Sequence, residues 1–197
     1  MLGEAMGPQL RAYLERLPDG LASYPGCLAK ASLYRSIIEE LPVDDAALPE
    51  VLRDLLRRPR AVSEWIPEVH SHAVLIAQYD QHFAALPEFV AHCYAAQRRL
   101  WASKIYAFMM RLMSPARLLA STSQRWGQFH RGSELVAERS GEGSAWLRLT
   151  APPHIYDEIA LIGLTEGLRA VIDCSGISSE FTRVECDEVG ARWRVRW

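Results

Sequence analysis

Histidine is the residue type in this sequence with the widest range of chemistry, because imidazole acts as a base, a hydrogen-bond donor or a metal ligand. His70 and His72 are two residues apart. On a strand they would share a face and could chelate a metal, but the surrounding pattern is helical and turns them to different faces. Glu68 lies four residues before His72, a spacing that predicts mild helix stabilisation. We therefore expect solvated or locally bonded histidines here and no zinc site.

The remaining candidates for catalysis are isolated in the sequence. His82 and His130 have no carboxylate or nucleophile partner at a recognisable spacing. The chain contains no GxxxxGK[ST], GxGxxG, GxSxG or HExxH motif, so the common nucleotide-binding, hydrolase and metalloprotease signatures are absent from it. We expect a protein that is not an enzyme. If it is one, acting on a small apolar substrate, His130 is the first residue to consider.

The cysteines form no metal-binding or disulfide pattern. Cys27, Cys93, Cys174 and Cys186 are far apart and none belongs to a CxxC pair. This usage predicts reduced thiols in a cytoplasmic protein. A cysteine–histidine pair that forms only in the folded protein remains open.

Aromatic residues in the middle of the chain predict either a hydrophobic core or the lining of an apolar pocket. Residues 126–132 carry extra weight, because they join the helical half to the strands, where a cleft can open. This segment also mixes aromatic rings with the polar His130. The candidate ligand-binding residues in this region are Trp101, Phe108, Trp126, Phe129, His130 and Trp146.

Gly163 and Gly167 form a GxxxG pattern in a segment predicted to be helical. Each glycine costs a helix about 1 kcal/mol relative to alanine, so a compensating interaction is needed. Close packing against a neighbouring element is one explanation. A backbone wall for a bound ligand is the other, and we keep both glycines as candidate site residues.

Composition argues against nucleic-acid and membrane partners. The net charge is −2, so no overall field attracts the protein to polyanions. The most apolar stretch, residues 105–113, is short and contains Arg111, which argues against a membrane span. No secretory signal segment is recognised at the start of the sequence. We expect a cytoplasmic location.

The first half of the chain predicts helices, and the second half predicts strands around one helix. Apolar periodicity and prolines indicate helices over residues 27–41, 44–58, 68–83, 88–101 and 100–113. The glycine turn at 140–144 predicts a hairpin, followed by a helix to about residue 173 and strands at 177–187 and 190–197. This order, β-β-α-β-β after helices, predicts an α+β fold with N-terminal helices packed on a small twisted antiparallel sheet. We expect a single domain over 1–197, with a helical part at 1–122 and a ββαββ part at 123–197.

The final segment, "ARWRVRW", combines arginine with tryptophan. Alternation predicts a strand with Trp193, Val195 and Trp197 on one face and the three arginines on the other. The arginines would form a solvated face, paired with Glu134 or Glu138 if those strands adjoin. This interpretation favours a folded sheet over a nucleic-acid-binding tail.

From about Arg99 onward, the sequence resembles a paralogous family of unknown function described from myxobacteria. The resemblance lies in "FMMRLMSPARLLAST", in Trp126 and Gly132 before a strand, in "GLTEGLRAVIDCSG" and in the terminal strand ending at Trp197. That family is similar in layout to the superfamily of 4-vinyl reductase domains, haem nitric-oxide-binding domains and transport-protein-particle (TRAPP) subunits. The resemblance implies helices on a twisted sheet, an apolar cavity, frequent dimerisation and a sensory or scaffolding role.

Departures from those relatives bear on cofactors. Vinyl-reductase-type domains have a Cys-Gly-Cys pattern at four-residue spacing, which Cys186 and Gly190 begin but Arg194 breaks. Haem-binding members have Tyr-x-Ser-x-Arg, which begins at Tyr34 but has Ile38 in the last place. The resemblance therefore argues against both zinc and haem. The transport-particle branch carries an acyl chain on a cysteine, for which Cys27 and Cys93 are the candidates.

The leading expectation is a non-enzymatic regulatory or sensory domain that binds a small apolar ligand, lipid-like or tetrapyrrole-like, between helices and sheet. The ligand and the cofactor, if any, are not identified by the sequence. A second expectation is a ligand-free homodimeric scaffold whose interface is the apolar helix face over residues 100–112.

Overall fold

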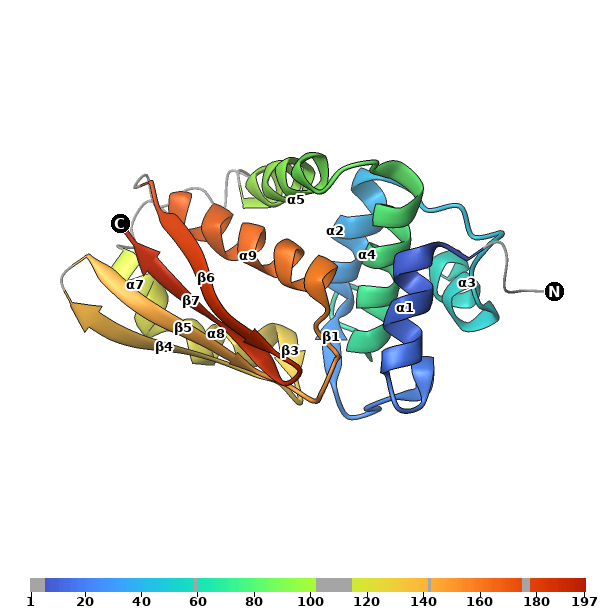
Figure 1. Ribbon diagram of the computed structural model, residues 1–197, viewed down its shortest axis with the longest axis horizontal. Coiled ribbons are helices and arrows are strands. Elements are labelled where there is room, and N and C mark those ends of the chain that lie inside the picture. Colours follow the sequence, from blue (N-terminus) through green and yellow to red (C-terminus); the bar gives the residue numbers. More distant parts are fainter. Residues whose placement is uncertain (1–5, 59, 102–114, 142, 175–177) are drawn as a thin grey trace.

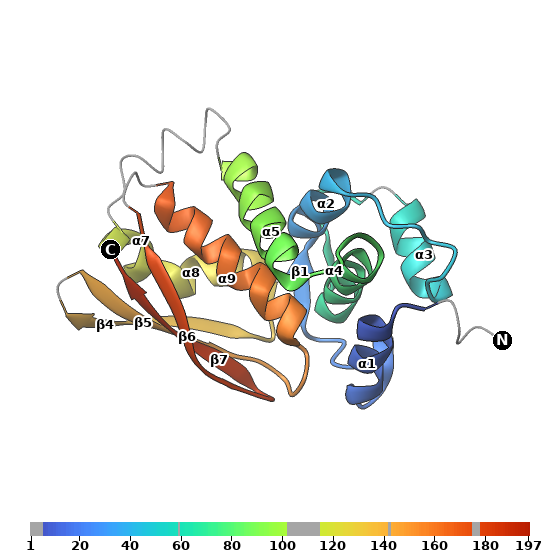
Figure 2. The ribbon, with the colours of Figure 1, turned by 45° about the horizontal axis from the view of Figure 1, so that its top comes forward.

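The computed structural model describes residues 6–58, 60–101, 115–141, 143–174 and 178–197. Helices of the first half lie at one side, the four-stranded sheet at the other, and α9 and α5 lie between them (Figures 1 and 2). The elements of the first half are α1 (Pro8–Arg16), η1 (Gly20–Ala22), β1 (Leu28–Lys30), α2 (Ala31–Glu40), α3 (Glu50–Arg57), β2 (Trp65–Pro67) and α4 (Glu68–His82).

The second half contains the larger sheet and the helices that cover it. Its elements are α5 (Leu86–Trp101), α7 (Pro115–Ala120), α8 (Thr122–Phe129), β3 (His130–Arg131), β4 (Glu134–Gly141), β5 (Ser144–Thr150), α9 (Glu158–Asp173), β6 (Glu180–Asp187) and β7 (Gly190–Arg196). The combination of helices with two antiparallel sheets confirms the predicted α+β class.

Helix α4 is the centre of the first half. It is apolar over most of its circumference, and residues 71–78 are all buried, which is typical of a helix surrounded by other elements. Its polar side chains complete neighbouring helices. Asp80 accepts hydrogen bonds from the backbone N–H groups of Gln9 (3.2 Å) and Leu10 (2.9 Å) at the start of α1. Gln78 donates to the carbonyl oxygens of Ile37 (2.9 Å) and Leu41 (2.5 Å) at the end of α2. These groups would otherwise lack partners within their own helices.

The four-stranded sheet has the order β4-β5-β7-β6, with every neighbouring pair antiparallel. Alternation along the strands buries one face, including Leu147, Leu149, Trp193 and Val195. Helix α9 packs on this inner face, where Trp193 Nε1–H donates to Thr165 Oγ1 at 2.9 Å. The order β4-β5-α9-β6-β7 matches the ββαββ order predicted from the sequence.

The outer face of the sheet carries arginines, as the alternation predicted, but their partners differ from the prediction. Strand β7 lies between β5 and β6, away from β4. Arg192 and Arg196 therefore face Glu185 (3.7 Å) and Glu180 (3.9 Å) of β6. The predicted pairing of the β7 arginines with Glu134 or Glu138 is wrong, because the strand order separates them.

A second, three-stranded sheet joins the two halves. Its order is β2-β1-β3, and both pairings are antiparallel. The predicted helix over 27–41 is therefore wrong in its first turn: Leu28–Lys30 is the middle strand, and the helix begins at Ala31. Backbone hydrogen bonds from two neighbours outweigh the helical apolar periodicity at this position.

Two further boundaries differ from prediction. Helix α3 begins at Glu50, after Pro49, and not at Asp44 or Asp45. Helix α8 occupies Thr122–Phe129, where the sequence pattern had suggested the approach to a strand. Most of the helix predicted over 100–113 lies outside the described residues.

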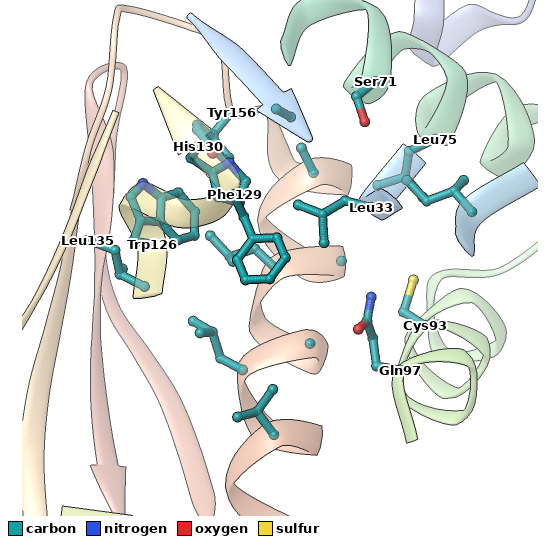
Figure 3. A pocket seen from close by; sticks show the side chains of 18 of the residues that line it. Leu33, Ser71, Leu75, Cys93, Gln97, Trp126, Phe129, His130, Leu135 and Tyr156 are labelled. Atoms are coloured by element: carbon teal, nitrogen blue, oxygen red, sulfur yellow. The ribbon is translucent and has the colours of Figure 1, made fainter. Parts of the chain in front are cut away.

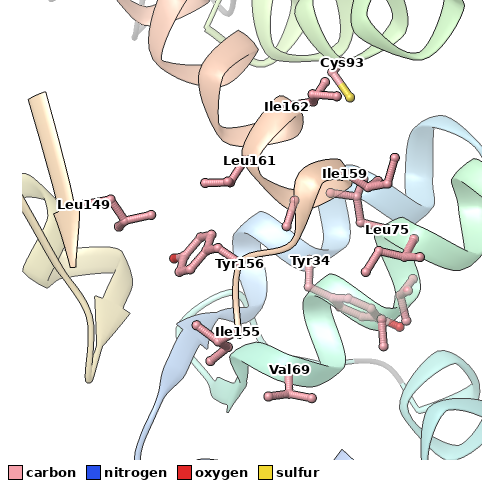
Figure 4. Close-up of a cluster of buried hydrophobic side chains, with 14 of the residues drawn as sticks. Tyr34, Val69, Leu75, Cys93, Leu149, Ile155, Tyr156, Ile159, Leu161 and Ile162 are labelled. Atoms are coloured by element: carbon pink, nitrogen blue, oxygen red, sulfur yellow. The ribbon is translucent and has the colours of Figure 1, made fainter. Parts of the chain in front are cut away.

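Buried side chains of both halves form one continuous cluster. Figure 4 shows Tyr34 and Val69 of the first half near Ile155 and Tyr156, which precede α9, and Ile159 within it. The hydrophobic core therefore extends across the junction between the two halves. In the described part of the chain, no helix has the length and apolar character needed to cross a bilayer.

Candidate ligand-binding site

A cavity of about 360 Å³ lies between the helices and the inner face of the larger sheet. This volume falls in the range of roughly 300–1,000 Å³ that is typical of small-molecule sites. Figure 3 shows Trp126, Phe129 and His130 on one side of α9 and Leu33 and Leu75 on the other. The walls come from α2, α4, α5, α7, α8, α9 and the strands β1, β3, β4 and β5.

The greater part of the cavity wall is apolar. It is provided by aliphatic side chains of α9, α7, α2 and the sheet, together with the rings of α8. The apolar lining residues include Leu33, Ile37, Leu75, Leu118, Leu119, Trp126, Phe129, Leu135, Leu147, Leu164, Leu168, Val171 and Ile172. Such a lining favours an occupant that is largely apolar.

Gly163 and Gly167 both line the cavity from α9. A Cβ atom on Gly163 would lie 3.1 Å from Leu75 Cδ2, which is tighter than ordinary contact. A Cβ on Gly167 would lie 3.6 Å from Gln97 Cδ, an ordinary distance. Close packing thus accounts for Gly163, while a Cβ at Gly167 would be in ordinary contact with the Gln97 side chain of α5, which also lines the cavity.

The structure brings together most of the predicted site residues that it describes. Trp126, Phe129, His130, Gly163 and Gly167 all line the cavity. The exception is Trp146, which does not: it alternates with the buried Ala145 and Leu147, so its ring lies on the outer face under Arg192, 4.4 Å from the guanidinium carbon. Phe108 and the side chain of Trp101 lie outside the described residues.

One end of the cavity is polar and centres on Glu68, whose side chain is 0% exposed. His130 Nδ1 lies 2.7 Å from Glu68 Oε1, and the Tyr156 hydroxyl donates to the same oxygen. The Cys27 thiol donates to Oε2 at 3.3 Å. His72 Nε2 is 3.8 Å from Oε1, and its Nδ1 is bonded to the Ile155 carbonyl oxygen at 2.9 Å. We call these five residues (Cys27, Glu68, His72, His130 and Tyr156) the Glu68 cluster.

The three-stranded sheet assembles this cluster from distant parts of the sequence. Cys27 immediately precedes β1, Glu68 immediately follows β2, and His130 begins β3. Pairing of β1 with β2 brings Glu68 beside Cys27, and the Glu68 backbone N–H donates to the Cys27 carbonyl oxygen at 3.0 Å. Pairing of β1 with β3 sets His130 opposite Ala29. The sheet thus places one end of the cavity at the junction of the two halves.

Trp126 fixes the position of His130 further. The two rings are stacked, with centroids 3.6 Å apart and planes 7° from parallel. Trp126 Nε1 in turn donates to Ser133, with 3.2 Å to both the carbonyl oxygen and Oγ. The imidazole is therefore held by a hydrogen bond at one edge and by an aromatic ring over one face, which restricts its rotation.

Electrostatics in the cluster favour an ionised Glu68 and protonated side chains of Cys27 and Tyr156. Burial by itself raises the pKa of Glu68, but the hydrogen bond and charge of His130, with His72 and Tyr156, bring the net pKa below its ordinary value. Burial and the neighbouring Glu68 raise the pKa of both Cys27 and Tyr156. Burial likewise raises the pKa of Cys93, at the other end of the cavity, to about 12. Both cavity-side thiols are therefore protonated at neutral pH and are poor nucleophiles.

Sequence reasoning missed the partner of His130. Glu68 is 62 residues away in the chain, and nothing in local spacing connects the two. The expectation that Glu68 and His72 are within reach of one another is met at 3.8 Å, but Glu68 is chiefly a hydrogen-bond acceptor for other elements. His70 is bonded to the Leu21 carbonyl oxygen at 3.0 Å, so its partner lies 49 residues away and not in the neighbouring sequence. Among the described residues, no cluster of three or more His, Cys, Asp or Glu could hold a metal ion.

Comparisons with known proteins find similarity in fold and not in sequence. No family model and no curated protein matches the chain. Among solved structures, an oxygen-binding H-NOX domain related to soluble guanylate cyclases, in its oxygen complex, superposes with a TM-score of 0.54 and 9% identity, covering 84% of this chain and 91% of that one. A structure solved for the molecular mechanism of H-NOX activation gives 0.54 and 10%, covering 84% and 92%.

A third similar structure was solved in work on protein-induced porphyrin distortion and haem redox potential. It superposes with a TM-score of 0.52 and 12% identity, covering 84% of this chain and 96% of that one. At such low identity the likeness concerns the fold alone. In fold, this chain is similar to H-NOX domains.

Proposed function

We propose that this protein is a regulatory or sensory domain that binds a small, mainly apolar molecule in the cavity between α9, α5, α8 and the sheet. The observation that carries the proposal is the cavity itself: about 360 Å³, with a largely apolar wall and the buried Glu68 cluster at one end. A protein that had only a structural role would gain stability by filling such a volume with side chains.

The fold comparison supports a ligand-binding role. The similar solved structures include a domain that binds oxygen and a protein in which haem redox potential is modulated. The resemblance to the myxobacterial family and a cytoplasmic location belong to the same proposal, since both are compatible with a regulatory protein. We also propose that residues 1–197 act as one domain, because one hydrophobic cluster extends across both halves.

Haem is the ligand that the similar structures suggest, so its fit to this cavity matters. His130 has a carboxylate on Nδ1, an arrangement common for metal-ligating histidines. However, the volume of about 360 Å³ is near the lower limit for small-molecule sites. The described lining contains one guanidinium, Arg125, for the two carboxylates of a haem, and Arg125 already donates to Ser121 Oγ at 2.8 Å. The described residues do not fit a haem, and we propose a smaller ligand.

Native mass spectrometry tests the proposal. The purified protein is weighed under native and denaturing conditions, and the proposed function predicts a mass difference equal to a retained small molecule. The variant Gly167→Leu places a side chain into the cavity from α9, and we expect it to fold and to lose that mass. The matched control is Gly127→Leu, because Gly127 is also helical but has nothing within 4 Å of its Cβ position.

The two variants separate cavity filling from a general effect of removing a helical glycine. Both should gain helix propensity, so a ligand lost only in Gly167→Leu supports the cavity. Equal ligand content in both variants, or wild-type protein that neither retains a molecule nor is stabilised by any apolar compound in thermal-shift screening, would contradict the proposed function.

Two other functions are less well supported. A homodimeric scaffold remains a prediction, since its proposed interface over residues 100–112 is almost wholly outside the described residues. An enzyme using His130 as a base has the orienting carboxylate that such a base needs. The neighbouring Cys27 thiol, however, is protonated and hydrogen-bonded to Glu68, so it does not supply a nucleophile.

A further inference from the structure

The three-stranded sheet has two faces of opposite character. Strands β1 and β2 bury only their middle residues, Ala29 and Ile66, each 2% exposed. His130 of β3 is paired with Ala29 and lies on the same inner face, where it lines the cavity (Figure 3). Since side chains alternate along a strand, the next residue, Arg131, lies on the outer face. The sheet therefore has a second surface, which faces away from the cavity.

That outer face combines positive charge with apolar surface. In the strand register Lys30 lies opposite Trp65, and Leu28 lies between Pro67 and Arg131. None of these five residues is buried, and we call the surface that they form the Trp65 face. Lys30 Nζ and Arg131 Cζ each lie 4.0 Å from the centroid of the Trp65 ring. Cation–π attraction thus holds both positive charges beside one indole.

The two cations of the Trp65 face have no carboxylate partner. Among the described residues, neither Lys30 nor Arg131 forms an ion pair, and Lys30 Nζ donates to the Ser63 carbonyl oxygen at 2.8 Å. Glu64, which precedes Trp65 in the chain, is instead bonded to Arg60 at 2.5 Å. Two unpaired positive charges beside the same ring repel each other, so this surface attracts a negatively charged group.

The turn next to the Trp65 face exposes an apolar side chain. Val62 directly precedes Ser63, the residue that accepts the hydrogen bond from Lys30. Its side chain is 57% exposed, more than that of any other large hydrophobic residue in the described part of the chain. Tryptophan and arginine are also the residue types most enriched among the strongest contributors to protein–protein binding. This composition matches a protein segment in which carboxylates flank an apolar side chain.

We propose that the Trp65 face docks an acidic segment of a partner protein. The carboxylates of that segment bind Lys30 and Arg131, and an apolar side chain between them packs on Trp65. The proposal goes beyond ligand binding, because it gives the domain a surface on which it meets another protein. Since His130 and Arg131 are consecutive residues of β3, that surface lies directly behind the polar end of the cavity.

Polyanions match the Trp65 face less well. Recognition of an anionic membrane surface typically uses clusters of about four to eight Lys and Arg residues. Binding of nucleic acid likewise depends on neutralising several phosphates along the backbone. The Trp65 face offers two cations, on a chain whose net charge is −2. Two cations around an apolar ring suit a short segment with a few carboxylates.

An NMR titration tests the proposal on the wild-type protein. The probe is the acetylated and amidated peptide Glu-Glu-Leu-Glu-Glu, and its neutral counterpart is Gln-Gln-Leu-Gln-Gln. The indole N–H resonance of Trp65 is assigned by its absence from the spectrum of Trp65→Phe. We expect the acidic peptide to shift this resonance and to bind about tenfold more tightly than the neutral peptide, because only its carboxylates pair with the cations.

Two double variants separate this surface from the net charge of the protein. Lys30→Gln with Arg131→Gln removes both cations of the Trp65 face, and we expect the acidic peptide to bind about tenfold more weakly. The matched control is Arg192→Gln with Arg194→Gln, whose arginines lie 4.4 and 6.0 Å from the Trp146 ring on the larger sheet. It changes the net charge equally beside another indole, and we expect an affinity within about twofold of wild type.

Several results would overturn the proposal. They are a Trp65 resonance that is unshifted by about 5 mM acidic peptide, equal binding of the neutral peptide, and equal weakening by the two double variants. A thymidine hexanucleotide or phosphatidylserine vesicles that shift the Trp65 resonance at lower concentration than the peptide would identify a polyanion-binding surface instead. Native mass spectrometry reports on the cavity and the Trp65 resonance on the opposite face, so the failure of this inference is distinguishable from that of the proposed function.

Discussion

Charged side chains gather in two contrasting regions of this protein. In the Glu68 cluster, one carboxylate with 0% exposure accepts hydrogen bonds from Tyr156 and Cys27 and is paired with His130 at 2.7 Å. On the outer face of the larger sheet, arginines and glutamates lie at 3.7–3.9 Å with much of each side chain in solvent. Those outer pairs are Arg148–Glu138, Arg192–Glu185 and Arg196–Glu180.

The difference shows that exposure to solvent, and not the number of charges, determines how much an ion pair contributes to the stability of the fold. Water solvates the outer arginines whether or not a glutamate is near, so these pairs contribute little. Water cannot replace a lost partner of Glu68, so each bond in that cluster is costly to remove. The region that stands out in the sequence, "ARWRVRW", is thus the less consequential of the two. The single glutamate at the start of α4 does not stand out, yet it connects three separate strands.

Removing Glu68 should produce the largest effect. Glu68→Ala leaves His130, Tyr156 and Cys27 buried without their acceptor, and we expect a loss of about 3–5 kcal/mol in the free energy of unfolding. Urea denaturation measures this loss. The matched control on the outer face is Glu185→Ala, for which we expect a change within about 0.5 kcal/mol. Similar losses for the two variants would break the comparison.

Low pH should also reduce the contribution of the Glu68 cluster to the free energy of unfolding. The reduction should be smaller than in Glu68→Ala, because a protonated Glu68 can still form hydrogen bonds. Since the pKa of Glu68 is lowered in the folded protein, its ionised form stabilises the fold above the unfolded value of 4.5, and this contribution is lost as the pH falls through the folded pKa. Asp157 and Glu166 have raised pKa values, caused first by burial, and act in the opposite direction.

The contribution of Glu68 can be isolated by comparing wild type with Glu68→Gln across the pH range. We expect the stability advantage of wild type to be full above pH 4.5 and to shrink progressively below it, as measured by urea denaturation at each pH. An advantage that stays constant from pH 7 to pH 3 would show that folding leaves the pKa of Glu68 unshifted, and one that grows as the pH falls would show a raised pKa.

Tyrosine hydroxyls provide a test of intermediate size. Tyr156→Phe removes one hydrogen bond to a buried charged acceptor, and we expect a loss of about 1.5–3 kcal/mol. Tyr34→Phe is the matched control, because the Tyr34 hydroxyl is buried and has no hydrogen-bond partner among the described residues. That variant should be unchanged or up to about 1 kcal/mol more stable. Thermal unfolding of both variants measures these changes. If Tyr156→Phe were as stable as wild type, or more stable, the hydrogen bond from Tyr156 to Glu68 would contribute nothing to the stability of the fold.

The smallest effect is expected for the outer arginines. Arg196→Ala should change the free energy of unfolding by less than about 0.5 kcal/mol, because its side chain is 52% exposed and its partner is 3.9 Å away. Addition of 1 M NaCl should remove even this difference from wild type, whereas the effect of Glu68→Ala should persist. A loss above 1 kcal/mol for Arg196→Ala would show that the outer face is more than a solvated surface.

Much of the fold could be predicted from the sequence because it depends on local patterns. Alternation placed Trp193 and Val195 on the buried face of β7, and the glycine turn gave the β4–β5 hairpin. Apolar periodicity after Pro67 gave α4 within one residue of its observed end. The errors in predicted secondary structure occurred where contacts with distant elements outweighed the local sequence pattern. Residues 28–30 look helical, but they form a strand because β2 and β3 supply hydrogen-bond partners on both sides.

The cavity was predictable only in outline. Trp126, Phe129 and His130 drew attention as a mixture of rings and a polar group, and the two glycines of α9 as a departure from helix propensity. All five line the cavity. Trp146 was grouped with them by residue type, but the period of two in its own strand turns it to the outer face.

The sequence by itself determined the α+β class, the order of the second half and the two faces of its strands, because these follow from the periodicity of neighbouring residues. Only the tertiary structure decided that Cys27, Glu68, His130 and Tyr156 meet, since their contacts join residues 41 to 88 positions apart in the chain. Strand pairing across such distances depends on the register of the three-stranded sheet. Burial then turns an ordinary glutamate into the charge that orients the cavity's histidine.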